Sequence, residues 1–301
     1  MSRLAVLAFC LAAFASTAAR SSSVSYQGLW WNPDQSGWGM NIAHQGDTLF
    51  ATWFTYDENG NGMWLVMPSA QLDPSSMDMD DMMMMYGMGM GMGMGGSSMP
   101  TYHGNLYRTT GPAFSTTSFD MSKVQATQVG TAQLQFFDGN YGAFTYTVGG
   151  NSTTVNITRD VFGPMPECSL GGTPAANPNF TDLWWRAGGT ESGWGVNVMQ
   201  EGDVVFGTWF TYDAKGQGEW LVIPGATRTA PMTWTGTLYR TRGPAFDGTW
   251  DASKVGSTAV GTATFAFTDA SSGTFSATVD GASISKPISR MVYANPATVC
   301  R

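Results

Sequence analysis

Methionine is concentrated in one stretch of the chain, which reads MDMDDMMMMYGMGMGMGMGGSSM from Met77 to Met99. Thioether sulfur is a soft, neutral ligand that needs no deprotonation, so clustered methionines suit Cu(I) and, by the same softness, Ag(I). Three aspartates in the stretch and the nearby His103 add harder donors that could hold Cu(II). The sequence therefore predicts a copper(I) site here. Its expected ligands are Met77, Met79, Met82, Met83, Met84, Met85, Met88, Met90, Met92, Met94, Met99 and His103.

The methionine-rich stretch is also compatible with three origins that involve no metal. It could be an expansion of a Gly-Met dipeptide by slippage, an oxidation sink, or an adhesive loop. A packed β-domain has no use for so long an unpatterned segment. We therefore expect the stretch to be disordered and exposed to solvent unless something binds it.

Few residues outside this stretch could carry catalysis. The only histidines are His44 and His103. Asp57 recurs later in the chain as Asp213, but each begins a glycine-containing turn, where an aspartate satisfies backbone amides. The sequence also has no glycine-rich phosphate loop and no clustered Cys/His zinc spacing. We therefore expect a protein that is not an enzyme.

An internal duplication organises the chain. Residues 29–68 and 183–224 share LWW, SGWG, TWFTYD and WLV in the same order, and GPAF and SKV follow in both copies. Such self-similarity indicates two homologous units. We expect repeat 1 over 24–162, a linker over 163–179, repeat 2 over 180–293 and a tail over 294–301. The methionine-rich stretch falls in an insertion over 73–100 that repeat 2 lacks.

Each repeat is predicted to be a closed β-barrel. Helix signals are nearly absent, and short runs rich in Thr, Val and aromatic residues alternate with turn residues at hairpin spacing. About eight consecutive antiparallel strands suit an up-and-down barrel, because closure removes exposed edges. The fold class is therefore all-β, with two tandem antiparallel barrels. In repeat 2 the expected strands are 183–186, 194–200, 204–212, 219–223, 233–239, 259–268, 273–279 and 284–293.

The strand over 204–212 carries large apolar side chains on both faces. Either the sister repeat covers its outer face or its inner face lines a cavity, and the sequence leaves both open.

The repeat resembles the SGWG…GTWFTYD…W repeat of uncharacterised exported proteins of proteobacteria, and this resemblance implies no activity. Each copy also resembles calycin barrels, which open with Gly-x-Trp and carry a basic residue on the last strand that packs on that tryptophan. Gly28, Trp30 and Arg159 fit this pattern, whereas repeat 2 has Asp182 in place of Gly28. The resemblance implies a calycin-like barrel.

Paired tryptophans offer an alternative function. Trp30-Trp31 and Trp184-Trp185 must each point to opposite faces of a strand, so one of each pair faces away from its own core. Trp31 and Trp185 are the candidate contacts for a carbohydrate or small apolar ligand, or for adhesion to a surface. A purely structural repeat protein is a third alternative.

Residues 1–19 predict the cellular location. One arginine, an apolar run and small residues at Thr17 and Ala19 indicate a cleaved signal peptide. No later stretch approaches the roughly 20 apolar residues of a membrane span. We expect a periplasmic or secreted protein without a span.

The cysteine positions and the net charge limit the partners that the protein can have. Cys168 and Cys300 follow matching positions of the two repeats, which in an oxidising compartment favours a disulfide over free or intermolecular thiols. A net charge of −8 without a basic run is unsuited to nucleic acid. The expected partner is a metal ion or a small molecule.

Overall fold

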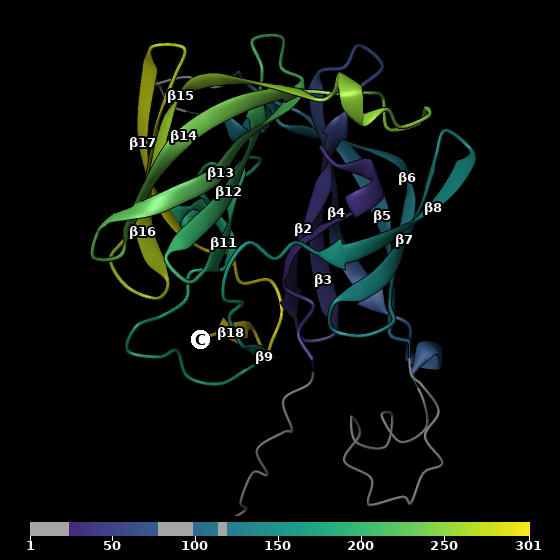
Figure 1. The fold of residues 1–301 in the computed structure, drawn as a ribbon, viewed down its shortest axis with the longest axis horizontal. Coiled ribbons are helices and arrows are strands. Elements are labelled where there is room, and N and C mark those ends of the chain that lie inside the picture. Colours follow the sequence, from purple (N-terminus) through teal and green to yellow (C-terminus); the bar gives the residue numbers. More distant parts are fainter. Residues whose placement is uncertain (1–23, 78–98, 114–118) are drawn as a thin grey trace, which may run out of the picture.

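The computed structural model describes residues 24–77, 99–113 and 119–301. Its strands form two closed barrels and a separate two-stranded sheet, which confirms the predicted all-β fold (Figure 1). The first barrel contains β1 (Gly28–Trp31), β2 (Gly39–Gln45), β3 (Thr48–Tyr56), β4 (Gly62–Leu72), β5 (Thr101–Thr110), β6 (Gln125–Phe136), β7 (Tyr141–Val148) and β8 (Asn151–Arg159). The second contains β10 (Asp182–Arg186), β11 (Gly195–Glu201), β12 (Val204–Tyr212), β13 (Gly218–Ala230), β14 (Thr233–Arg242), β15 (Gly256–Phe267), β16 (Ser272–Val279) and β17 (Ala282–Arg290).

In both barrels each strand pairs antiparallel with the next, and the last closes on the first. The closing register is the same in each, because Trp30 lies opposite Arg159 and Trp184 lies opposite Arg290. Short 3-10 turns are the helical elements of the described residues: η1 (Pro33–Gln35), η2 (Pro74–Ser76), η3 (Met121–Lys123), η4 (Ala187–Gly189) and η5 (Ala252–Lys254). Within that part of the chain no helix has the length and apolar character needed to cross a membrane.

Four strands of the second barrel differ by three residues or more at one end from the sequence-based expectation. β14 continues to Arg242 rather than ending at Tyr239, and β15 begins at Gly256 rather than at Ala259. β13 continues to Ala230 rather than ending at Ile223, because a register shift lets Pro224 and Gly225 lie within the strand. β17 ends at Arg290, and the next residues leave the barrel to contact the first one.

Side chains fill the interiors of both barrels. Trp30, Phe136 and Phe144 are 0 % exposed inside the first, as are Trp184 and Phe275 inside the second. Aromatic rings contact one another directly there; the Trp53 and Phe144 ring centroids, for example, lie 5.1 Å apart. Each lumen is therefore a packed core.

The outer faces of β3 and β4 pack against the outer faces of β12 and β13, so the sister repeat covers the second apolar face of these strands. The Trp64 indole donates to Thr211 O at 3.1 Å, and the Trp220 indole donates to Thr55 O at 2.8 Å. A Cβ at Gly62 would lie 3.1 Å from the Trp220 indole nitrogen, so glycine allows this close approach. The two barrels therefore share a third apolar core with near-twofold symmetry.

Each barrel also holds a segment of the other. Gln45, at the end of β2, accepts from the backbone amides of Tyr293 and Ala294 at 2.9 and 3.0 Å. At the equivalent position Glu201 accepts from Phe162 and Gly163 at 2.7 and 2.6 Å. These reciprocal bonds fix the segments that leave β17 and β8.

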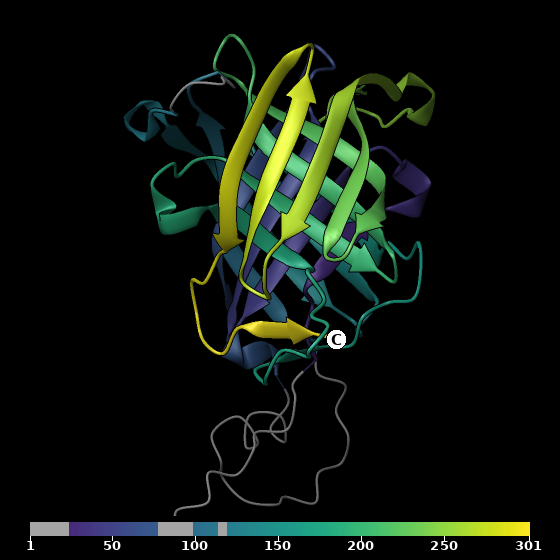
Figure 2. The same cartoon turned by 90° about the vertical axis from the view of Figure 1, so that its left-hand side faces the viewer.

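The expected linker and tail pair with each other. β9 (Cys168–Leu170) and β18 (Thr298–Cys300) form an antiparallel sheet in which Cys168 lies opposite Cys300. Figure 2, which looks onto the second barrel, shows β18 beneath it beside the C-terminus.

Candidate functional site

The methionine-rich insertion begins and ends beside His103. β4 ends at Leu72 and β5 begins at Thr101, and the backbone amide of Asp73 donates to Thr101 O at 2.7 Å. His103 Nε2 lies 3.6 Å from Asp73 Oδ2, and both side chains are exposed. A hydrogen bond from the Ser75 hydroxyl lowers the pKa of Asp73, which keeps this carboxylate ionised.

The structure places three of the predicted metal ligands. Met77 follows η2 and Met99 is 42 % exposed, so with His103 they mark the base of the insertion. The remaining predicted ligands lie outside the described residues: Met79, Met82, Met83, Met84, Met85, Met88, Met90, Met92 and Met94. Within the described ranges no cluster of three or more His, Cys, Asp or Glu residues could hold a metal ion.

The disulfide prediction is confirmed. Cys168 and Cys300 are bonded and join positions 132 residues apart in the sequence. The bond links the segment after the first barrel to the segment after the second, so it ties the ends of both repeats together.

The tryptophan pairs divide as the strand geometry requires. Trp30 and Trp184 are fully buried in the barrel cores, whereas Trp31 and Trp185 are half-buried on the outer faces. Because the lumens are filled, a ligand held by aromatic residues would have to contact aromatic side chains outside them, such as these two. Whether they bind one stays a prediction.

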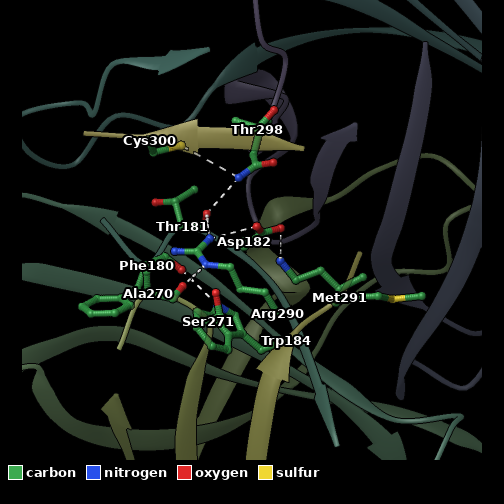
Figure 3. A network of polar contacts seen from close by, with 12 residues as sticks. Phe180, Thr181, Asp182, Trp184, Ala270, Ser271, Arg290, Met291, Thr298 and Cys300 are labelled. Carbon is green, nitrogen blue, oxygen red and sulfur yellow. Dashed lines mark hydrogen bonds and ion pairs between the residues drawn. The ribbon is translucent and has the colours of Figure 1, made fainter. Parts of the chain in front are cut away.

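An arginine closes the end of each barrel, as Figure 3 shows for the second. The Arg290 guanidinium lies 4.9 Å from the Trp184 ring centroid, a cation–π distance. It donates to the carbonyls of Asn179, Thr181 and Ala270, and its Nη1 lies 2.8 Å from Asp182 Oδ2. Burial raises the pKa of Asp182, although Arg290 acts in the opposite direction.

The first barrel repeats this arrangement without the carboxylate. Arg159 lies 4.9 Å from the Trp30 ring centroid and donates to the carbonyls of Ser25, Gln27 and Gly139. Gly28 stands where Asp182 stands in the second barrel. Burial lowers the pKa of Arg159 to about 10, the direction expected for a cation that has lost hydration.

His44 is a buried group that the first barrel alone carries. Its Nδ1 accepts from the Tyr26 amide at 3.2 Å, and its Nε2 lies 3.2 Å from the Tyr102 hydroxyl. Gln200 takes the equivalent place and accepts from the Phe180 amide at 3.0 Å. Burial lowers the pKa of His44 to about 4, so the ring is neutral at pH 7 and acts as a hydrogen-bond acceptor.

The mouth of the second barrel carries charges that the first lacks. Glu191 Oε1 lies 2.9 Å from Lys286 Nζ and 3.6 Å from Arg186 Nε, and its Oε2 accepts from the Trp194 indole. At the first barrel's mouth, the Trp38 indole donates to the neutral Gln35 at 3.2 Å. The adjoining cavity of about 20 Å³ is large enough for about one water molecule. The cluster therefore acts as a structural ion pair network.

Sequence reasoning did not find the hydrogen bonds by which Gln45 and Glu201 hold a segment of the other repeat. It also missed the role of His44 and the Asp182–Arg290 ion pair. The signal that could have found most of them is a difference in residue type at equivalent positions of the two repeats, as between Gln45 and Glu201.

Comparisons with known proteins add no identity. Neither protein-family models, curated protein sequences nor solved structures give a match to this chain. The resemblance of the repeat to exported proteobacterial proteins and to calycin barrels therefore stays a prediction.

Proposed function

We propose that this chain is an exported, non-enzymatic binding protein whose methionine-rich segment captures Cu(I) or Ag(I). The observation that carries the proposal is the insertion itself, which places 11 methionines between Met77 and Met99 of repeat 1. The second barrel closes the same hairpin with only Pro231 and Met232 between β13 and β14. The barrel fold thus does not require the segment, and metal binding is the functional explanation of its composition that we propose.

The surroundings of the insertion support a metal role. His103 and Asp73 are exposed at its base, where an imidazole and a carboxylate can add harder donors to the thioethers. A disulfide is typical of proteins in oxidising compartments, which supports export. In such compartments thioethers remain usable ligands for Cu(I) when free thiols oxidise.

The test is an anaerobic competition between mature protein and a chromogenic Cu(I) chelator. We expect the protein to compete for at least one Cu(I) ion and Ag(I) to displace it, while Zn(II) and Mg(II) bind far more weakly because they prefer harder donors. Replacing Met82–Met85, Met88, Met90, Met92 and Met94 by leucine retains apolar bulk and removes the sulfur, so it should abolish competition.

Met121→Leu is the matched control, because Met121 is 47 % exposed and lies outside the insertion. Its Cu(I) affinity should equal that of the parent. If the multiple leucine variant competes as well as the parent does, the metal proposal is wrong, and binding by the outer tryptophans Trp31 and Trp185 becomes the favoured function.

A further inference from the structure

A cavity of about 320 Å³ lies at the closed end of the first barrel, beside β9. We call it the Arg159 pocket. Arg159 is the only charged side chain in its lining, and no carboxylate of the described residues contributes to it. Ligand pockets typically enclose roughly 300–1,000 Å³. This one therefore has room for a small organic molecule.

The two barrels differ in how they neutralise the closing arginine. Both guanidinium groups donate to three backbone carbonyls, but only Arg290 has a carboxylate, that of Asp182, at 2.8 Å. Among the described residues no acidic side chain lies within ion-pair distance of Arg159. Glu201 interacts with it only at longer range, and one Glu201 oxygen is held by two backbone amides. The positive charge of Arg159 is therefore only partly compensated.

The first barrel has glycine where the second has this carboxylate. A Cβ at Gly28 would lie 2.6 Å from Arg159 Nη1, and the backbone there has a φ of +149°. Both conditions favour glycine over aspartate at this position. Any anion that pairs with Arg159 would therefore come from outside β1.

The rest of the pocket suits an apolar body attached to that anion. Val24 and Met165 line it and are 59 % and 41 % exposed, and Met199 adds a third apolar wall. The Asn140 amide and the Ser169 hydroxyl also line it and can donate to a second oxygen. We infer that the Arg159 pocket binds a small organic monocarboxylate, with its carboxylate at Arg159 and its apolar part against Val24 and Met165. The ion pair between Asp182 and Arg290 in the second barrel is the model for the contact between the ligand carboxylate and Arg159.

The experiment is calorimetric titration of the mature, disulfide-bonded chain with sodium hexanoate at constant ionic strength. We expect saturable binding of hexanoate and much weaker binding of hexan-1-ol and hexylammonium, which lack the negative charge. Sodium sulfate tests charge alone. If sulfate binds as tightly as hexanoate, the apolar wall is unused and the assigned ligand class is wrong.

Variants of the exposed wall locate the site without disturbing the arginine, whose removal could unfold the barrel. Met165→Glu places a negative charge in the pocket and should weaken hexanoate binding by about tenfold or more. Val292→Glu, at a position that is 62 % exposed and does not line the pocket, should leave the affinity unchanged. Absence of hexanoate binding to the parent, or equal affinities of the two variants, would overturn the inference.

Discussion

The buried His44 makes stability depend on pH in a direction that the structure determines. Folding lowers its pKa from the ordinary 6.5 to about 4. A group whose pKa falls on folding stabilises the native state fully above its unfolded pKa, and that contribution is lost as the pH falls from 6.5 toward 4. At 1.36 kcal/mol per pKa unit, the full loss is about 3 kcal/mol, of which about 2 kcal/mol falls between pH 7 and pH 5.

His44→Gln isolates this term, because repeat 2 shows that glutamine fits the position. Gln200 Oε1 accepts from the Phe180 amide at 3.0 Å, as His44 Nδ1 accepts from the Tyr26 amide at 3.2 Å. At pH 7 the variant should lose about 1 kcal/mol with the Tyr102 hydrogen bond. Between pH 7 and pH 5 it should then lose about 2 kcal/mol less than the parent.

Urea unfolding at pH 7, 6 and 5 measures the difference, and carboxylates that titrate in both proteins cancel. His103→Gln is the control, because it removes an exposed histidine whose pair with Asp73 lies at the surface, so it should change stability by less than about 1 kcal/mol at each pH. If parent and His44→Gln lose the same free energy between pH 7 and pH 5, the ring is not buried and neutral as described.

Three further predictions concern contacts elsewhere in the chain. Reducing the disulfide opens a 132-residue connection and should lower stability by up to about 4–5 kcal/mol on the chain-entropy model, whereas two freely alkylated thiols in native protein would contradict the bond itself. Deleting 77–98 should shift thermal unfolding by only a few degrees, because loop length enters stability logarithmically; a drop of tens of degrees would mean that the insertion packs. Asp182→Ala leaves Arg290 buried without its carboxylate and should cost about 3 kcal/mol in urea unfolding. Asp203→Ala breaks an exposed pair with Arg228 and should cost less than about 1 kcal/mol; equal costs would refute the burial argument.

Local sequence signals were sufficient for the strands and for barrel closure. Turn residues such as Asp213 and Gly216 separate runs that alternate in the manner of strands, and consecutive hairpins leave closure as the solution without exposed edges. The disulfide was predictable because Cys168 and Cys300 occupy matching places. β13 was underestimated because Pro224 resembles a strand end, and only the register shift shows that the strand continues.

Contacts between the repeats were not predictable from the sequence. The third strand has two apolar faces, and only the packed structure shows that the sister barrel covers one of them. The same holds for Gln45, whose partner Tyr293 lies 248 residues later in the chain. No periodicity or turn signal reports a pairing over that separation. The methionines at 79–94 lie outside the described residues, so their role stays a prediction.

The two repeats share the same barrel fold. The differences that matter here are in the charged side chains at equivalent positions. In repeat 2 the arginine that closes the barrel pairs with the Asp182 carboxylate. The residue of repeat 2 that binds backbone amides of repeat 1 is the acidic Glu201. In repeat 1 the arginine has glycine beside it, and the residue equivalent to Glu201 is the neutral Gln45. Glu201 acts on Arg159 at long range, so repeat 2 partly compensates a charge that repeat 1 leaves open. Partial compensation is consistent with a half-buried Arg159 that could still pair with the anion proposed above. The two repeats therefore share a fold but differ in the charges at equivalent positions, so a ligand that pairs with Arg159 is expected at repeat 1 only.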